Sequence, residues 1–89
     1  MSPSFEFDTA KSEVNLAKHG IDFAEARGLW DDPQAVVVKA RSSTEPRFAL
    51  ISRCKGRIWS AFYTDREQQV RIISVRRARD NEERLYYGR

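Results

Sequence analysis

The stretch RFALISRCKGRIWSAFYTDREQQVRIISVRR, residues 47–77, decides the fold of this chain. Two apolar runs, residues 48–53 and 58–64, flank a short loop in which Gly56 can adopt the positive φ angle that a tight hairpin needs. A second turn over residues 65–69 leads into a third apolar run, residues 70–75. Because short connections join strands that run in opposite directions, we predict three consecutive antiparallel strands.

A first helix is predicted upstream, over residues 9–19. Asp8 can accept hydrogen bonds from the free amides of the first turn, and Gly20 can close the helix in a left-handed conformation. Ala10, Val14 and Ala17 recur at the spacing of one helix face. We therefore expect this apolar stripe to pack against the sheet.

A second helix is predicted over residues 23–31. Asp22 and Glu25 are three residues apart, as in a capping box, and Pro33 ends the helical pattern. Its expected buried stripe consists of Phe23, Ala26, Leu29 and Trp30. Trp30 is accordingly interpreted as a core residue and not as a recognition residue.

The remaining segments complete an α+β architecture. The alternation of residues 5–8 favours a short edge strand over a mere packing contact onto the first helix. The β-branched run at residues 35–38 predicts a further strand, and the residues from 78 onwards favour a terminal helix. We expect one domain, residues 1–89, in which two N-terminal helices pack on an antiparallel β-sheet and a short helix ends the chain.

Charge is divided unevenly along the chain. Residues 46–89 hold 11 of the 16 Lys and Arg but 5 of the 13 acids, a net charge of +6, whereas residues 1–45 carry −3. Ten of those 11 cations are arginine, whose planar guanidinium matches phosphate oxygens two at a time. The C-terminal half is thus predicted to bind a polyanion, while the acidic half suits a basic partner.

Cysteine content and the N-terminal residues indicate a cytoplasmic protein. Residues 1–8 carry two acids and no apolar run, which is not typical of a signal peptide, and no segment approaches membrane-spanning length. Cys54 is the single cysteine, which excludes an intrachain disulfide and a cysteine cluster for zinc. We expect a reducing cytoplasm, no bound metal and no cofactor.

Particular residues, beyond these patterns, resemble a known family. The first group comprises Asn15, Lys18, His19, Gly20, Phe23, Ala26, Trp30, Asp32 and Pro33. The second group comprises residues 63–66 (YTDR) and 71–74 (RIIS), followed by Arg76, Ala78, Glu82 and Tyr86. In order and spacing, these groups are similar to the N-terminal and C-terminal signatures of the BrnT toxins of bacterial toxin–antitoxin pairs. The resemblance covers residues 5–87, nearly the whole chain.

The resemblance implies a RelE-like fold and a ribonuclease activity that inhibits translation by cleaving RNA, whether free or ribosome-bound. It also implies neutralisation by a BrnA-like ribbon-helix-helix antitoxin. Promoter DNA is then contacted only through the complex, mainly by the antitoxin. Three positions depart from the family pattern: Asp65 replaces a usual Glu, Val75 a usual Ala, and Arg79 a small hydroxyl residue that would cap the last helix.

RNA can be cleaved without a metal when its 2′-hydroxyl attacks the neighbouring phosphorus, which requires a proton acceptor, a proton donor and cations. The cations available near the last strand are Arg66, Arg71, Arg76, Arg77 and Arg79. Strand alternation predicts that Arg71 and Arg77 point to one face and Arg76 to the other. We favour the Arg76 face, with Arg66 reaching across from the preceding turn. For each arginine, a weak pair in solvent is the alternative.

The predicted catalytic residues are Arg66, Arg76, Glu82 and Tyr86, and the predicted RNA contacts are Lys18, Arg71, Arg77 and Arg79. Glu82 and Tyr86 share one helical face, where they can act as an acid–base pair or as an anchor with a stacking surface. Alternatively, Glu82 pairs with Arg76 while Tyr86 packs on the sheet. His19 stands in the last helical turn and is interpreted as a helix cap, although an imidazole is also a natural acid or base.

The sequence therefore predicts a metal-independent endoribonuclease. One alternative is a non-enzymatic nucleic-acid-binding or co-repressor module, since the same arginines would bind DNA phosphates, although no basic recognition helix is evident. Another is a small protein-interaction domain, because residues 48–51 and 58–63 are apolar on both strand faces and leave one sheet face for a partner.

Overall fold

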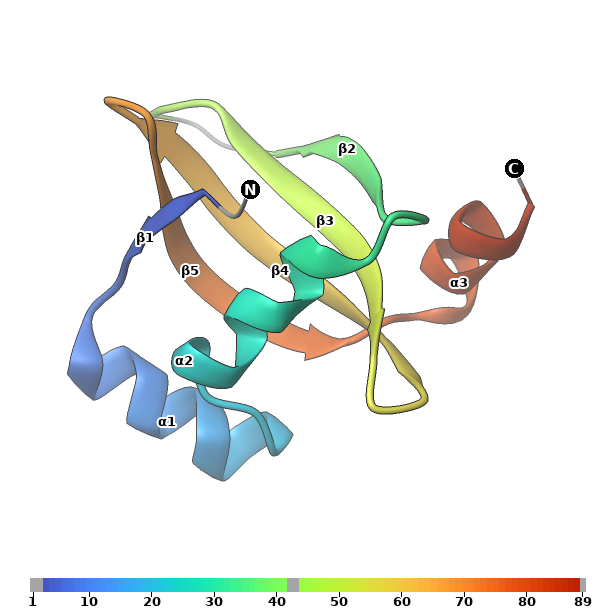
Figure 1. The fold of residues 1–89 in the computed structure, drawn as a ribbon, viewed down its shortest axis with the longest axis horizontal. Helices are drawn as coiled ribbons and strands as arrows, with labels where there is room; N and C mark the ends of the chain where they lie inside the picture. The colour runs from blue at the N-terminus through green and yellow to red at the C-terminus, as the bar shows by residue number, and fades with distance from the viewer. Residues whose placement is uncertain (1–2, 42–43, 89) are drawn as a thin grey trace.

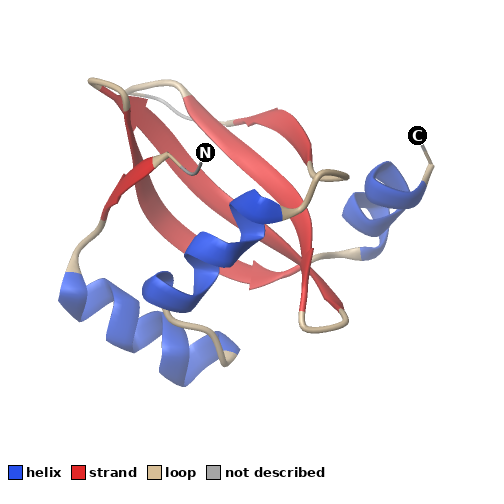
Figure 2. Cartoon of the chain, viewed as in Figure 1, coloured by secondary structure: helices blue, strands red, loops and turns tan. Residues whose placement is uncertain are grey.

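The computed structural model describes residues 3–41 and 44–88, which form a five-stranded sheet with helices around it (Figure 1, Figure 2). In chain order the elements are β1 (Ser4–Glu6), α1 (Thr9–His19), α2 (Phe23–Ala26), the 3-10 helix η1 (Arg27–Asp31), β2 (Val36–Ala40), β3 (Arg47–Cys54), β4 (Arg57–Arg66), β5 (Gln69–Arg77) and α3 (Asp80–Tyr87). The strand order across the sheet is β1-β5-β4-β3-β2. The predicted α+β class is confirmed.

Strands β2 to β5 form the predicted antiparallel meander, because tight turns reverse the chain. Lys55 and Gly56 between β3 and β4 have φ angles of 52° and 76°, and Glu67 and Gln68 between β4 and β5 have φ angles of 47° and 68°. Positive φ at both central residues of a turn matches the right-handed twist of the paired strands. The short β1 is a strand, as expected, but it runs parallel to β5 and pairs only with residues 69–71.

The helix boundaries follow the predicted capping residues. Asp8 accepts hydrogen bonds from two backbone amides at the start of α1, at 2.8 and 3.2 Å, and Gly20 ends the helix with a φ angle of 81°. Asp22 accepts a hydrogen bond from the Glu25 amide at 2.7 Å and begins α2. The predicted helix over residues 23–31 is present in two parts, since its second half winds more tightly as η1.

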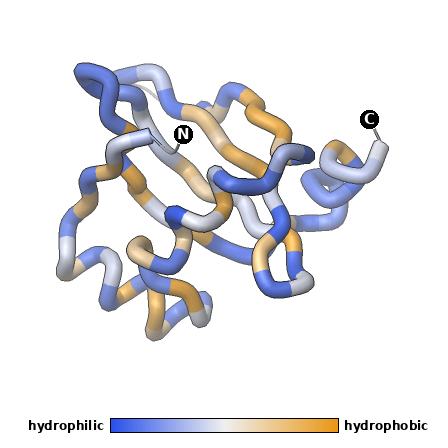
Figure 3. The backbone as a smooth tube through the Cα atoms, in the orientation of Figure 1, coloured by the Kyte–Doolittle hydropathy of each residue, from blue (hydrophilic) through white to orange (hydrophobic). Residues whose placement is uncertain are grey.

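The main hydrophobic core lies between the sheet and the layer formed by α2 and η1. Phe23, Ala26 and Leu29 are almost fully buried there against residues of β3, β4 and β5. The Trp30 ring centroid lies 5.3 Å from that of Tyr63, which confirms that Trp30 is a packing residue. In Figure 3, hydrophobic segments run along the strands and hydrophilic segments occupy turns at their ends.

The predicted buried face of α1 is wrong. Ala10, Val14 and Ala17 are exposed, Val14 to 55%, and the helix buries Ser12 and Asn15 instead. The physical reason lies at the edge of β5. Because β1 covers that edge only at residues 69–71, backbone groups further along β5 need another partner.

The Asn15 side chain is that partner. Its amide nitrogen donates to the carbonyl oxygens of Val75 and Ile21 at 2.9 and 2.8 Å, and its own oxygen accepts from the Val75 amide at 3.1 Å. Ser12 accepts a hydrogen bond from the Phe23 amide at 2.8 Å. This helix face can bury polar side chains because their hydrogen-bonding groups are satisfied.

The alternation predicted for β5 is also wrong, because a β-bulge interrupts it. Phe62 of β4 is paired with Ser74, whereas the next residue of β4, Tyr63, is paired with Ile72. Ile73 is therefore an extra residue on β5. Side chains after the bulge point to the face opposite to the one that simple alternation assigns.

The bulge changes which arginines share a face. The core side contains Val70, Ile72 and Val75, from both sides of the bulge. Arg71 and Arg76 both point away from the core, although simple alternation would separate them. Arg77 lies on the core side, with its guanidinium carbon 5.9 Å from the centroid of the Trp59 ring.

The short helix α3 packs on the sheet face opposite to α1 and α2. Tyr86 is 7% exposed and packs with Ile51 and Ile58, which alternate along their strands with residues of the main core. The helix begins without a small hydroxyl cap, because the Arg79 amide donates to the Glu82 carboxylate at 2.8 Å. Within residues 3–41 and 44–88, no helix is long and apolar enough to cross a membrane.

Replacing Asn15 by Ala is expected to destabilise the protein by about 2–3 kcal/mol, because the amide and carbonyl of Val75 lose their partner. The matched change Val14→Ala, on the exposed side of the same helix, should cost less than about 0.5 kcal/mol. Urea unfolding followed by circular dichroism measures both values. Equal losses of unfolding free energy in the two variants would contradict the role of Asn15 as the hydrogen-bond partner of the Val75 backbone.

Candidate nucleic-acid interface

The sheet face that points away from α1 and α2 carries most of the predicted site residues. Along β4, Ser60, Phe62 and Thr64 alternate with the core residues Ala61 and Tyr63, so they point to this other face. The pairing of β4 with β5 and of β4 with β3 adds the arginines. We call this surface the open face and define it by Arg47, Ser60, Phe62, Thr64, Arg66, Arg71, Ser74 and Arg76.

Arg76 and Glu82 form the shortest ion pair of the open face. Arg76 Nη1 and Nη2 donate to Glu82 Oε1 and Oε2 at 2.8 and 2.9 Å, and only 23% and 14% of the two side chains are exposed. Arg76 Nη1 also donates to the Arg77 carbonyl at 3.1 Å. The guanidinium carbon lies 5.0 Å from the centroid of the Phe62 ring. These contacts hold the guanidinium in one orientation.

One edge of the Arg76 guanidinium stays available. Glu82 and the Arg77 carbonyl engage Nη1 and Nη2 from the end of the fork, and no hydrogen bond within the described residues uses Nε. The Nε–H and one Nη2–H lie side by side along the remaining edge of the planar group. A phosphate can accept two hydrogen bonds from that edge while Glu82 continues to hold the opposite end.

The Glu82 carboxyl is held in its ionised form. Burial alone would raise its pKa, but hydrogen bonds from the Arg76 side chain and the Arg79 amide lower the pKa to about 2. The Ser60 hydroxyl contributes to this lowering of the pKa, although its geometry falls short of a hydrogen bond. A carboxylate with such a pKa is a weak base at neutral pH. The geometry matches the alternative in which Glu82 pairs with Arg76.

Arg66 and Arg71 also have carboxylate neighbours, but their pairs are long. Arg66 lies 3.7 Å from Glu45, and Arg71 lies 3.8 Å from Glu6, with between 34% and 54% of each side chain exposed. Exposed pairs of this length contribute little and are screened by salt. Arg66 and Arg71 share the open face with Arg76. Because their ion pairs contribute little to stability, each can exchange its carboxylate for a phosphate at a low cost in free energy.

Tyr86 is buried between α3 and the sheet, where it anchors the helix. Its hydroxyl donates to Asp32 Oδ2 at 2.7 Å, and the Arg53 amide donates to the same oxygen at 2.9 Å. Burial would raise the pKa of Asp32, but the hydrogen bonds from Tyr86 and from backbone amides lower the pKa below its ordinary value. The Tyr86 hydroxyl is thus committed to a structural contact between α3 and the segment that follows η1.

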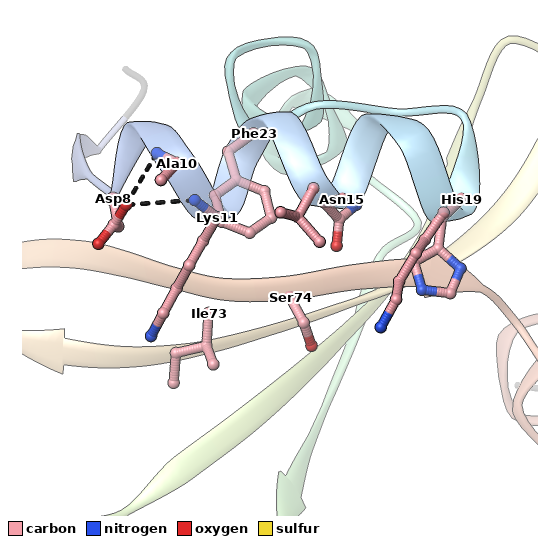
Figure 4. Close-up of a pocket in the computed structure, with 10 residues that line it drawn as sticks. Asp8, Ala10, Lys11, Asn15, His19, Phe23, Ile73 and Ser74 are labelled. Atoms are coloured by element: carbon pink, nitrogen blue, oxygen red, sulfur yellow. Dashed lines mark hydrogen bonds between the residues drawn. The ribbon is translucent and has the colours of Figure 1, made fainter.

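A further cationic region borders the open face along the edge of β5. Lys11, Lys18 and His19 of α1 line a cavity of about 490 Å³ together with Ile73 and Ser74 of β5. Figure 4 shows the Lys11 side chain extending from the helix toward Ile73. Through Ser74, Lys18 therefore adjoins the open face.

His19 does not cap α1 by a hydrogen bond from its ring. The helix ends through the Gly20 amide, which donates to the Leu16 carbonyl at 2.9 Å, and the described residues give the imidazole no hydrogen bond or ion pair. Its place in the last turn still suits a positive charge, because the helix dipole is negative there.

The structure separates the other predicted contacts and adds residues that were not predicted. Arg79 is exposed just before α3, and Arg77 lies on the core side of the sheet. Sequence reasoning missed Arg47, Phe62 and Thr64 as members of the open face. Their signal was the alternation of β3 and β4, which places them on the same side as Ser60. Within the part of the chain that the structure describes, no three His, Cys, Asp or Glu side chains are grouped closely enough to hold a metal ion.

Arginines beside an aromatic ring on a sheet face, with lysines at its edge, are typical of proteins that bind the phosphate backbone of nucleic acid. The comparison with family models makes this class specific. The family described as "Ribonuclease toxin, BrnT, of type II toxin-antitoxin system" matches residues 7–82, and the chain therefore belongs to the BrnT family. A search of curated proteins found no match.

Membership of the family confirms the resemblance seen in the sequence. The protein is a ribonuclease toxin of a type II toxin–antitoxin system, which implies an RNA substrate and an antitoxin partner. Because the family description names a ribonuclease, it favours this function over the alternative of a non-enzymatic nucleic-acid-binding or co-repressor module. The open face is accordingly a candidate site for RNA.

The Arg76–Glu82 pair should make stability depend on acid pH. Because the folded pKa of Glu82, about 2, lies below its ordinary value of 4.5, the pair stabilises the protein above pH 4.5 and loses this contribution as the pH falls toward 2. The loss should be on the order of 2 kcal/mol, allowing for partial exposure. Urea unfolding between pH 6 and pH 2 measures it. Glu82→Gln should flatten the profile, whereas the neighbouring Glu83→Gln should leave it unchanged; identical profiles would contradict the assignment.

Proposed function

We propose that the toxin cleaves single-stranded RNA on the open face without a metal ion, by attack of a ribose 2′-oxygen on the adjacent phosphorus. In this reaction the 2′-oxygen gives up its proton to a base and forms a bond to phosphorus. The bond from phosphorus to the 5′-oxygen breaks, and that oxygen takes up a proton. The available edge of the Arg76 guanidinium is the observation that carries the proposal.

Arg76 is proposed to stabilise the charge that develops on phosphorus in the transition state. Its orientation is preset by Glu82 and by the Phe62 ring, so no reorganisation is needed when the charge appears. Glu82 then acts as a positioning residue, because its low pKa makes it a poor base. Tyr86 acts in the same way, by holding α3 and hence Glu82 in place.

The other basic residues are proposed to bind the RNA backbone around Arg76. Arg66 and Arg71 have the weakest ion pairs and lie on the same face. Lys18 adjoins that face at the edge of β5, and Arg79 is exposed at the start of α3. The position of Arg77 on the core side argues against a contact to the same RNA strand.

We further propose that the antitoxin is a basic ribbon-helix-helix protein that contacts the outer side of α1. Leu16 is 47% exposed on α1 and is not among the residues that line the cavity between α1 and β5. Residues 1–45 carry a net charge of −3, and because α1 itself has two lysines and one glutamate, the acids that suit a basic partner flank the helix. In this arrangement the complex, and not the toxin alone, binds promoter DNA, in the cytoplasm.

The double variant Arg76→Ala, Glu82→Gln should cleave RNA about 10²–10³-fold more slowly than the native toxin, because the transition state loses its main charge partner. The Glu82 change prevents an unpaired buried carboxylate, so the fold should be kept. Cleavage of a labelled single-stranded RNA in EDTA measures the rate. Arg27→Ala, on the opposite side of the molecule, should cleave normally. Native activity in the double variant, or activity that requires a divalent metal, would refute the mechanism.

Changing Leu16 to Asp should weaken neutralisation by the antitoxin while RNA cleavage is retained. The apolar contact would then carry a charge that must be desolvated on binding. Growth during co-expression and co-purification of the two proteins measure the effect. Leu85→Asp is the matched control, because Leu85 is equally exposed, at 47%, on α3. Neutralisation that survives in the Leu16 variant would place the antitoxin elsewhere.

A further inference from the structure

Three polar atoms of the open face are buried without any hydrogen-bond partner. Ser60 Oγ lies at the Arg76 end, and the other two, Oγ1 of Thr64 and Nε of Arg47, lie at the opposite end. Thr64 as a whole is 1% exposed. On β5, Thr64 is paired with Arg71. On β3, Phe48 is paired with Tyr63, so the preceding residue, Arg47, stands opposite Thr64. The hydroxyl therefore lies between two arginines on the neighbouring strands.

A buried polar atom without a hydrogen-bond partner destabilises the folded protein unless a ligand bonds to it. A buried hydroxyl or N–H without a partner is destabilising, and a Val at position 64 would have almost the shape of Thr without this penalty. Unpaired polar groups of this kind are uncommon in folded proteins. The Thr64 hydroxyl and the Arg47 Nε–H are therefore suited to a ligand that supplies acceptor oxygens.

The charges around these atoms favour an anion. Three arginines, Arg47, Arg66 and Arg71, gather at this end of the open face with two carboxylates, which leaves one positive charge in excess. The carboxylates of Glu6 and Glu45 pair at 3.8 and 3.7 Å with Arg71 and Arg66, and neither bonds to the two buried atoms. A phosphate group, with acceptor oxygens and full negative charge, fits the donors that remain.

The distance to Arg76 shows that this site and Arg76 contact different phosphates. Ser60, the partner of Arg76, and Thr64, the partner of Arg71, are four residues apart on β4, which corresponds to about 13 Å along the strand. A single phosphate cannot contact both ends. The half-buried Phe62 ring lies between them on the same strand face, where an unstacked base can pack.

We propose that Arg47, Thr64 and Arg71 form a second phosphate-binding site, here called the distal site, for a non-scissile phosphate of the single-stranded RNA substrate. The inference rests on the proposed function, because Arg76 marks the scissile phosphate. The arginine side chains are long and flexible, so an arriving phosphate draws them outward and gains access to the Thr64 hydroxyl. The site therefore contributes to the binding of RNA long enough to span both ends.

Thr64→Val tests the distal site without removing any charge. The probes are a dinucleotide and a pentanucleotide of 2′-O-methyl RNA, which cannot be cleaved, with binding measured by fluorescence anisotropy and competition. The variant should bind the pentanucleotide about tenfold more weakly and the dinucleotide equally well, because it loses one hydrogen bond to a charged group. Its thermal unfolding midpoint should be equal to or above that of the native protein, since an unsatisfied hydroxyl is removed.

Arg71→Ala provides the second measurement. It should lower pentanucleotide affinity further and reduce the slope of log affinity against log salt by about 0.7, the value for one phosphate contact to a single strand. Arg27→Ala should change neither quantity. Native pentanucleotide binding by Thr64→Val, or a lowered unfolding midpoint in that variant, would overturn the distal site and give Thr64 a structural role.

The two proposals fail in different ways. If only the distal site is wrong, the Arg76→Ala, Glu82→Gln variant should still cleave RNA slowly, whereas Thr64→Val should bind the pentanucleotide like the native protein. Unchanged cleavage in that variant, together with weaker pentanucleotide binding by Thr64→Val, would keep the distal site as an RNA contact and reject Arg76 as the catalytic residue. RNA binding that is unaffected by changes at both ends would reject the open face altogether.

Discussion

The extra residue at Ile73 is the constraint on which the open face depends. In a regular strand Arg71 and Arg76 would point to opposite sides, because their positions differ by five, an odd number. The bulge brings both to the open face and keeps Val70, Ile72 and Val75 in the core. Immediately after the bulge, Asn15 bonds to the backbone of Val75, so α1 secures the strand where its regular pairing is interrupted.

The arginines of the open face differ in how tightly the fold holds them. Arg76 is fixed by two short hydrogen bonds to Glu82, and Glu82 is held by α3, which Tyr86 attaches to Asp32. Arg71, in contrast, has a long and partly exposed ion pair. Tight pairing preorganises a charge for a transition state, whereas loose pairing leaves a charge free to follow a mobile polyanion. The face thus combines one rigid guanidinium with more adaptable ones.

Local features of the fold could be predicted because they depend on residues close together in the chain. Asp8 and Gly20 bound α1 as expected, and the turn at Gly56 reverses the chain. The buried side of α1 could not be predicted in this way. Its apolar stripe faces solvent, because Asn15 meets a strand edge 60 residues further along the chain, and hydrogen bonds there outweigh the burial of Val14.

The sequence by itself determined the α+β class, the order of the elements, the family, and the concentration of arginine near the last strand, since these follow from composition, periodicity and motifs. Only the tertiary structure decided which arginines share a sheet face, because a single bulge reverses the sides of all later residues in β5. It also decided that Glu82 forms an ion pair with Arg76 and that Thr64 lies between two arginines. Those relations depend on strand register, which arises from packing between distant segments and not from any local pattern.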